Sequence, residues 1–290
     1  MDLSVIIVSY NVRAYLKNCL LSVRRASSDI KCEIFVVDNN SGDDTCNMVE
    51  LEYPEVILIR NSENSGFSAA NNKAIRLAKG RFTLLLNPDT IVAEDTFSKC
   101  ISFMDNHNDA GAMGVRMVDG EGRFLPESKR ALPTIDSAFY KISGLSSVFP
   151  KSRIFNKYYL SHIDIYETSV TEVISGAFML INSDVFSKTG LLDEDFFMYG
   201  EDIDLSKRIL LAGYQNYYYP EVQITHFKGK STSRENYTDI IHFYRAMRIY
   251  VRKDYKNRSG FLRSGIISAI YIRESVAILI RFLRKTKVFN

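Results

Sequence analysis

Residues 3–40 have the sequence LSVIIVSYNVRAYLKNCLLSVRRASSDIKCEIFVVDNN, and this stretch decides the fold. It begins with an apolar run, Leu3–Val8, continues through a helical pattern over Val12–Ala26, and ends in a second apolar run, Ile34–Val37. Short apolar runs bounded by polar residues are typical of strands buried on both faces. Two such strands joined by an amphipathic helix form a right-handed βαβ unit with parallel strands.

The same alternation continues outward from this unit to about residue 118. Further strands are predicted at Val56–Ile59, Phe82–Leu86 and Ala112–Val118, and further helices at Asp43–Leu51, Ser68–Lys79 and Glu94–His107. Repeated βαβ units predict an α/β protein with a doubly wound, mostly parallel sheet flanked by helices.

The second half is less regular, because Leu132–Thr171 shows no clean period. After it we expect a strand at Val173–Ile181 and a helix from about Gly200 to Ala212. Two short strands near Asn216–Tyr219 and Val222–His226 follow, and then a helix from Thr238.

Composition narrows the class of protein. With 290 residues, 46% hydrophobic and 24% charged, the chain has the composition of a folded globular protein. The four cysteines form no CxxC pair, and the N-terminus lacks a signal-peptide pattern, so we expect free thiols and a cytoplasmic location.

The C-terminal tail is basic, although the whole chain carries a net charge of only +3. From Arg252 onward, ten Lys and Arg residues face two acidic residues, which gives the tail a net charge of +8. Insertion of Gly265–Leu283 across a membrane is disfavoured, because its apolar residues contribute roughly 4 kcal/mol and its three charges cost about 8 kcal/mol.

The tail is better described as an amphipathic helix from Tyr271. Its apolar side is predicted to carry Ile272, Val276, Leu279 and Leu283. Its basic side is predicted to carry Arg273, Arg281, Arg284 and Lys285. Such a helix can bind an anionic membrane surface, or it can pack on the protein with its charges in solvent. No nucleic-acid reader motif accompanies the basic residues, so we expect no nucleic-acid partner.

Polar motifs follow four of the predicted strands, where open α/β sheets bind ligands. They are Val8-Ser9-Tyr10-Asn11, the Asp38–Thr45 segment, the Asn61–Asn72 segment with Gly66 at a tight turn, and Leu-Leu-Leu-Asn87-Pro88-Asp89-Thr90. A carboxylate such as Asp89 just past a buried strand suits a hard divalent cation that also binds phosphate oxygens. Neither GxGxxG nor GxxxxGK[ST] occurs in the expected context, which argues against hydride transfer and P-loop chemistry.

Taken in order, these motifs resemble those of a known family. Val-Ser-Tyr-Asn, Val-Val-Asp-Asn-Asn-Ser, Asn-x-x-Asn-x-Gly-Phe, Leu-Asn-Pro-Asp, Gly-Glu-Asp-Ile-Asp-Leu and a downstream His are similar to motifs of family 2 glycosyltransferases with the GT-A fold. The resemblance covers about residues 3–230 and points to the subgroup that builds bacterial surface polysaccharides, rhamnosyltransferase-like enzymes among them. It implies an enzyme that moves a sugar from a nucleotide-diphosphate sugar to an acceptor hydroxyl.

The resemblance also implies residue roles. Tyr10 and Asp38 would hold the nucleotide, and further contacts to the nucleotide-sugar would come from Val8, Asn11, Asn40, Asn64, Gly66, Asn72 and Asn87. Asp89 and His226 would bind Mg²⁺ or Mn²⁺. Lys228, Lys230, Ser231 and Thr232, which follow His226, could contact the diphosphate.

Asp202, beside Glu201, would be the catalytic base. A single carboxylate opposite the diphosphate can take the proton of the attacking hydroxyl, and a single displacement inverts the anomeric carbon. If Asp202 is not the base, Glu201 and Asp204 are the next candidates.

One departure from the family pattern concerns the metal. Many members have an acidic residue where this chain has Asn87, so Asp89 is the only carboxylate of the motif. Two other functions stay open: a nucleotide-sugar-binding regulator without catalysis, and a sugar-nucleotide nucleotidyltransferase. The second would need a Gly-rich N-terminal loop, and Val8–Arg13 has no glycine.

The resulting domain organisation has two parts. Residues 1–237 are expected to form the catalytic domain, with a nucleotide-sugar-binding half (1–120) and an acceptor-side lobe (121–237). Residues 238–290 are expected to form a basic helical extension. The acceptor would be a glycan or lipid-linked sugar at the inner face of the plasma membrane.

Overall fold

The computed structural model of the chain describes residues 1–142, 145–149, 152–228, 237–256 and 258–287. The strands in these ranges are β1 (Leu3–Ser9), β2 (Cys32–Asp38), β3 (Ile57–Arg60), β4 (Phe82–Leu86), β5 (Thr90–Ile91), β6 (Ala110–Val118), β7 (Ser169–Thr171), β8 (Phe178–Asn182) and β9 (Gln215–His226). The α-helices are α1 (Arg13–Ala26), α2 (Thr45–Glu52), α3 (Gly66–Ile75), α4 (Thr96–Asn106), α5 (Ile135–Ile142), α6 (Leu145–Val148), α7 (Phe186–Thr189), α8 (Glu201–Leu211), α9 (Tyr237–Asp254) and α10 (Gly260–Lys287). The elements predicted up to residue 118 are confirmed, with small shifts of their ends.

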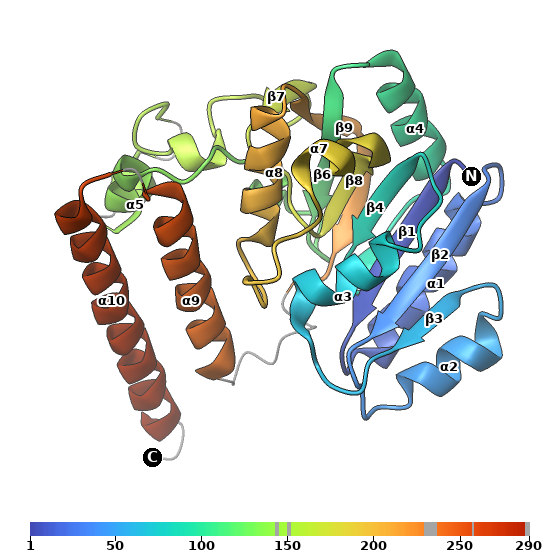
Figure 1. The fold of residues 1–290 in the computed structure, drawn as a ribbon, viewed down its shortest axis with the longest axis horizontal. Helices are drawn as coiled ribbons and strands as arrows, with labels where there is room; N and C mark the ends of the chain where they lie inside the picture. Colours follow the sequence, from blue (N-terminus) through green and yellow to red (C-terminus); the bar gives the residue numbers. More distant parts are fainter. Residues whose placement is uncertain (143–144, 150–151, 229–236, 257, 288–290) are drawn as a thin grey trace.

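One mixed sheet runs through the molecule in the order β3-β2-β1-β4-β8-β6-β9-β5, with β7 beside β9 (Figure 1). Strands β1 to β4 are parallel, as the βαβ pattern predicts. Strand β8, from the second half of the chain, lies antiparallel between β4 and β6. This insertion brings the carboxyl ends of β1, β2 and β4 to the same edge of the sheet as the start of β8.

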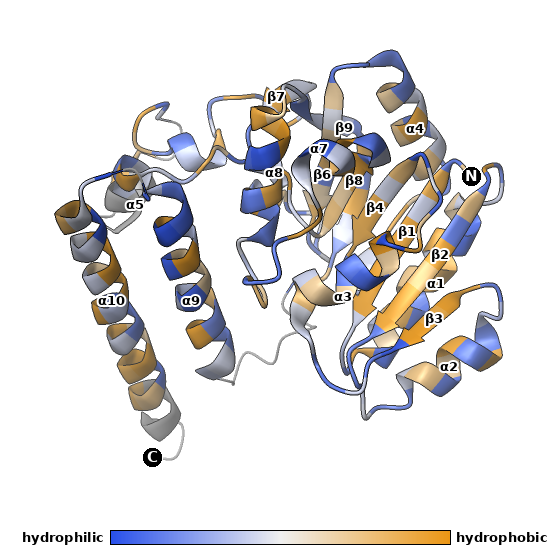
Figure 2. Ribbon diagram, viewed as in Figure 1, coloured by the Kyte–Doolittle hydropathy of each residue, from blue (hydrophilic) through white to orange (hydrophobic). Residues whose placement is uncertain are grey.

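Helices cover both faces of the central strands, so β1 and β4 are buried along their whole length and are mostly apolar (Figure 2). On β1, Val5 and Ile7 pack with α1, α2 and α4, whereas Ile6 and Val8 pack with α3 and α8 on the other face. This double burial is the reason that the first strand is a continuous apolar run rather than an alternating one.

Two predicted strands differ from the observed ones. The strand expected over Val173–Ile181 begins only at Phe178, because a turn closed by the Phe178 amide and the Ser175 carbonyl precedes it. The two short strands expected around Pro220 form the single strand β9, whose register against β6 shifts between Val115 and Arg116. Proline has no N–H to donate, which fits a bulge at this position.

Helices α9 and α10 form a two-helix hairpin on the side of the molecule away from β3 (Figure 1). Helix α9 docks on the loop before α8: Lys253 pairs with Asp195 at 2.8 Å, and the Phe197 ring stacks on His242 with centroids 4.4 Å apart. Among the described residues, no helix is both long enough and apolar enough to cross a membrane.

The predicted apolar side of the tail is exposed in the hairpin. Ile272, Val276, Leu279 and Leu283 are between 39% and 64% exposed. Helix α10 contacts α9 through a different side, which carries the buried Ile270 and Glu274, the latter paired with Arg248. Arg281 is half-buried rather than on the fully solvated side, and the side chains of Arg284 and Lys285 lie outside the described part.

Candidate active site

The loops that follow β1 and β2 are tied together by hydrogen bonds. Asn11, which has a positive φ of 54°, donates its backbone N–H to Ser41 Oγ at 2.9 Å and accepts from the Gly42 N–H through Oδ1 at 2.8 Å. Arg13 N donates to Asp43 Oδ2 at 2.9 Å. Two of the predicted nucleotide-binding loops therefore form one rigid edge.

A cavity of about 460 Å³ opens beside this edge, lined by Asp38, Asn40, Ser41, Gly42, Asp44, Thr45, Cys46, Asn47, Arg60 and Asn61. Asp38 is buried; its Oδ2 accepts from the Ser41 N–H at 2.8 Å, while Oδ1 has no hydrogen-bond partner among the described residues. A buried carboxylate oxygen without a donor at a cavity is what a ligand hydroxyl or N–H would satisfy.

The other residues predicted for this region lie at different depths. Tyr10 is 44% exposed, and Asn40 is exposed with a positive φ of 65°. The side chain of Val8 is buried in the core against α3, so only its backbone can reach a ligand.

The loop before α3 is built around Gly66. Its φ is +82°, and an added Cβ would lie 2.4 Å from the backbone oxygen of Phe197, so only glycine fits. The Phe67 N–H donates to the same Phe197 oxygen at 2.6 Å, and Asn64 Oδ1 accepts from the Gly66 N–H at 3.0 Å. The loop is thus fastened to the segment just before α8.

Asn72 is occupied by structural contacts. Its side-chain amide donates to the Leu192 carbonyl and to Glu194 Oε1, both at 2.8 Å, and its oxygen accepts from the Leu192 N–H at 3.0 Å. These bonds fix the chain before α8, and they leave little capacity for a nucleotide-sugar.

The residues predicted to bind a metal are brought together. Asp89 and His226, which are 137 positions apart in number, lie side by side because β5 pairs with the end of β9 in the register Thr90 to His226. Asp89 Oδ1 is 3.2 Å from His226 Nε2, and Asn87 Nδ2 is 3.5 Å from the same nitrogen. Both Asp89 and His226 are buried.

The donor set fits a hard or borderline divalent cation. A carboxylate and an imidazole suit Mn²⁺, and Nδ1 of His226 is buried without a hydrogen-bond partner among the described residues. Within the described ranges, no group of three or more His, Cys, Asp or Glu residues is placed to hold a metal. Further ligands would therefore have to come from Asn87, from solvent or from a bound diphosphate.

Asp202 stands at the first turn of α8 and is paired with Arg130. Arg130 Nη2 lies 2.5 Å from Asp202 Oδ2, and the side chains are only 11% and 14% exposed. Arg130 also donates to the Ile174 carbonyl and the Tyr158 hydroxyl at 3.4 Å. Asp202 Oδ1 accepts from the Ile203 N–H at 2.8 Å, so the carboxylate is held in one orientation.

Glu201 is the neighbour of Asp202 but lies in a different environment. It is buried, and its Oε2 has no hydrogen-bond partner among the described residues. Burial raises the pKa of Glu201 well above its usual range, and the Asp202 carboxylate raises it further. Glu201 therefore favours the neutral form.

The predicted sites converge on Gly176. Its N–H donates to Asp202 Oδ2 at 3.3 Å, and the next residue, Ala177, accepts from the Asn87 N–H at 3.0 Å. A Cβ on Gly176 would lie 3.6 Å from the Phe67 ring. Gly176 and Ala177 are neighbours, and adjacent Cα atoms are about 3.8 Å apart. The segment that contains Asn87 and Asp89, the Gly66 loop and Asp202 therefore face one small region.

Four residues that follow His226 are predicted to contact the diphosphate. Lys228 pairs with Glu127 at 2.5 Å, and Lys230, Ser231 and Thr232 lie outside the described residues. Two further residues at the site are not predicted from the sequence: Arg130, the partner of Asp202, and Arg60, which lines the cavity beside Asp38. Arg60 directly follows the predicted third strand, a position that could have suggested it, whereas nothing local marks Arg130 in its irregular segment.

Comparison with known proteins gives consistent matches. A family model described as Glycosyl transferase family 2 matches residues 4–190. The N-acetylglucosaminyl-diphospho-decaprenol L-rhamnosyltransferase of Mycobacterium tuberculosis is 26% identical over 244 residues, which cover 80% of this chain and 78% of the relative. The poly(ribitol-phosphate) beta-N-acetylglucosaminyltransferase TarS of Staphylococcus aureus is 24% identical, over 83% of this chain and 39% of the relative.

Among solved structures, the mannosyltransferase PcManGT from Pyrobaculum calidifontis in complex with GDP-Man and Mn²⁺ superposes with a TM-score of 0.59. It is 18% identical, and the match covers 94% of this chain and 69% of that one. This likeness shows the fold.

Proposed function

The chain belongs to glycosyl transferase family 2 and is a glycosyltransferase with the predicted GT-A fold, and from this premise we propose how its residues divide the work of transfer. A nucleotide-diphosphate sugar binds at the carboxyl ends of β1, β2 and β4. An acceptor hydroxyl attacks the anomeric carbon from the Asp202 side, and the nucleoside diphosphate leaves. Family membership removes the nucleotidyltransferase alternative.

The donor's nucleotide occupies the cavity beside Asp38. The unpartnered Asp38 Oδ1 accepts a hydrogen bond from the base or ribose, and Tyr10, exposed at the rim, packs against the nucleoside. Asn11 and Asn40 shape the loops through their positive φ angles. Gly66 and Asn64 set the loop that faces the sugar, and Asn72 supports that region from behind.

Asp89 and His226, with Asn87 beside them, would hold the divalent metal, Mg²⁺ or Mn²⁺. When bound, it would supply positive charge to offset the charge that develops on the departing diphosphate. Support comes from the closeness of the two buried side chains, with Asp89 Oδ1 3.2 Å from His226 Nε2. The solved relative that contains Mn²⁺ is consistent with this assignment.

Asp202 takes the proton from the acceptor hydroxyl. Arg130 pairs with the carboxylate and orients it, while burial raises the pKa of the neighbouring Glu201 and favours its neutral form. With one base and one displacement, the anomeric configuration of the product is opposite to that of the donor.

The acceptor is a lipid-linked or growing glycan of the cell surface. The M. tuberculosis relative is described as acting on a diphospho-decaprenol-linked sugar, and the S. aureus relative on poly(ribitol-phosphate). A membrane-bound acceptor suits a protein whose α10 presents Ile272, Val276 and Leu279 to solvent within a strongly basic tail. We assign residues 1–237 to the catalytic domain and 238–290 to an extension that lies on the inner membrane face.

The observation that carries this proposal is the convergence of Asp202, Asn87 and the Gly66 loop on Gly176–Ala177. A test is to incubate the purified protein with a panel of nucleotide-sugars and measure release of nucleoside diphosphate. We expect release from one donor above all, and loss of release in Asp89→Asn. A protein that binds a donor without turning it over, with or without acceptor, would instead be the non-catalytic regulator.

A further inference from the structure

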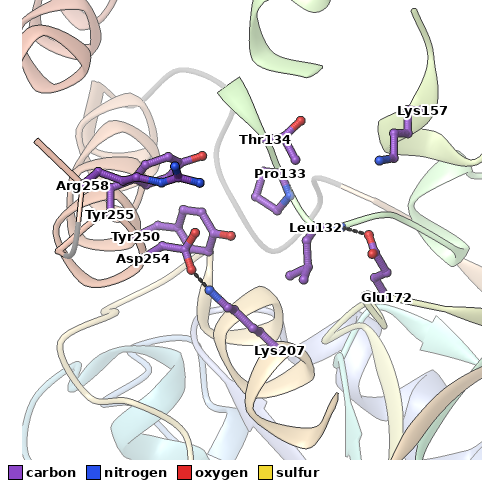
Figure 3. Close-up of a pocket in the computed structure, with 10 residues that line it drawn as sticks. All are labelled: Leu132, Pro133, Thr134, Lys157, Glu172, Lys207, Tyr250, Asp254, Tyr255 and Arg258. Carbon is purple, nitrogen blue, oxygen red and sulfur yellow. Dashed lines mark hydrogen bonds and ion pairs between the residues drawn. The ribbon is translucent and has the colours of Figure 1, made fainter. Parts of the chain in front are cut away.

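A second cavity lies between the catalytic domain and the helical hairpin, away from the donor site. Its volume is about 310 Å³, and it is lined by Leu132, Pro133, Thr134, Lys157, Glu172, Lys207, Tyr250, Asp254, Tyr255 and Arg258 (Figure 3). The first six come from the catalytic domain and the last four from the extension. Neither part forms the cavity alone.

The charges in the lining are unevenly satisfied. Both carboxylates are engaged: Glu172 Oε2 accepts from the Leu132 N–H at 2.7 Å, and Asp254 pairs with Lys207. Lys157 and Arg258 form no ion pair with any described residue. Figure 3 shows their side chains extending toward the cavity from opposite sides. The lining carries three cations and two carboxylates, which gives it a net charge of +1, and Lys157 and Arg258 are its two cations without an ion-pair partner among the described residues.

An anion is the ligand that two unpaired cations select. Arg binds phosphate oxygens through a planar fork of donors, and Lys binds them as a point charge. The hydroxyls of Thr134 and Tyr255 also line the space and can donate to phosphate oxygens.

The cavity is also close to the proposed base. Lys207 lies on α8 five positions after Asp202, which corresponds to roughly 8 Å along the helix axis. On the opposite wall, Leu132 is two residues from Arg130, the partner of Asp202. The cavity therefore adjoins both elements that hold the Asp202–Arg130 pair, namely α8 and the segment after Arg130.

We propose that this cavity binds the phosphate or diphosphate group of the acceptor, so that the extension completes the acceptor site. The inference rests on the proposed function, because it assumes that Asp202 marks where the acceptor reacts. The extension then has a second role beyond membrane contact: Arg258 anchors the acceptor's phosphate while Lys157 holds it from the domain side.

The test compares two double variants of the full-length protein with equal net charge. Lys157→Gln with Arg258→Gln removes the cavity cations. Arg153→Gln with Lys256→Gln removes one exposed cation from each of the same two regions, outside the cavity lining. Inorganic phosphate is titrated into each metal-free protein at constant ionic strength and followed by phosphorus NMR. We expect the cavity variant to bind at least about tenfold more weakly than the wild type and the control variant.

Equal phosphate affinity in all three proteins would overturn the proposal. Vesicles of phosphatidylglycerol and phosphatidylcholine separate the acceptor from a lipid headgroup as the source of phosphate. We expect both double variants to bind phosphatidylglycerol vesicles equally, since their net charges match; selective loss by the cavity variant would make the cavity a lipid site. Nucleotide-sugar turnover by the wild type is scored separately, so failure of the proposed function is seen independently of the phosphate titration.

Discussion

Arg130 and Asp202 form a largely buried ion pair, with Nη2 2.5 Å from Oδ2 and side chains only 11% and 14% exposed. The two residues come from an irregular segment and from the first turn of α8, so the pair ties the acceptor-side lobe to the helix that carries the proposed base. Such pairs matter most when one partner is removed, because the other charge is then left buried. Arg130 is a positioning residue, since it acts through Asp202.

Loss of Arg130 should lower turnover more than donor binding. We expect Arg130→Gln to reduce kcat by about tenfold to a hundredfold with little change in donor KM, because Asp202 loses its orientation. Arg130→Lys keeps the charge and should restore part of kcat. Steady-state kinetics of both variants measures this. A purely structural Arg130 would change stability in both variants without separating kcat from KM.

Glu201 gives a prediction about pH. Its folded-state pKa is raised by burial, so the folded state binds the extra proton, and stability falls as pH rises from the ordinary glutamate range through the raised pKa. Glu201→Gln imitates the neutral form. We therefore expect its Tm to exceed that of the wild type increasingly from pH 5 to about pH 9. A Tm difference that does not change with pH would show that Glu201 is charged throughout.

The metal site can be strengthened as well as weakened. Asn87 Nδ2 lies 3.5 Å from His226 Nε2, so Asn87→Asp would place a second carboxylate beside Asp89. We expect Mn²⁺ to bind about tenfold more tightly to Asn87→Asp and much more weakly to Asp89→Asn, because carboxylates are preferred ligands of hard cations. Electron paramagnetic resonance of free Mn²⁺ measures both affinities without an activity assay. If neither substitution changes Mn²⁺ binding, Asn87 and Asp89 are not metal ligands.

Membrane binding by α10 can be tested with a matched pair of substitutions. Ile272→Glu and Leu279→Glu place charges on its exposed apolar side, and Leu51→Glu and Leu211→Glu do the same at exposed positions on α2 and α8. We expect only the α10 double variant to lose cosedimentation with anionic vesicles, because burial of apolar side chains in the interface drives such binding. If both double variants sediment alike, charge alone accounts for vesicle binding.

Much of the first half of the fold was predictable because its signals are local. Each buried strand, such as Leu3–Val8, is a mostly apolar run, and each helix between strands has an apolar face. The position of the candidate site residues at one edge of the sheet was also predictable, because parallel strands bring their carboxyl ends to the same edge.

The features that were not predicted from the sequence depend on contacts between distant segments. The antiparallel insertion of β8 between β4 and β6 leaves no local mark, and neither does the pairing of Arg130 with Asp202, 72 positions later. The contacts of Asn72 are also made across the chain: its amide donates to the Leu192 carbonyl and to Glu194, and its contact with a nucleotide-sugar stays a prediction.

The assignment of the base leads to the last prediction. Asp202→Asn keeps the size of the side chain and removes the proton acceptor, so the protein should fold. General-base catalysis contributes about 10²–10⁴ in rate, and we expect that loss in kcat while donor KM stays near the wild-type value. Asp204→Asn is the matched control, because Asp204 lies on the same helical turn but pairs with Arg208 at 2.7 Å. It should retain most of the rate. Near wild-type transfer by Asp202→Asn would indicate that Glu201 is the base, which Glu201→Gln then tests directly.

The stereochemistry of the product tests the mechanism independently of all variants. One displacement inverts the anomeric carbon, so NMR of the new linkage should show the anomeric configuration opposite to that of the donor. A retained configuration would require two displacements.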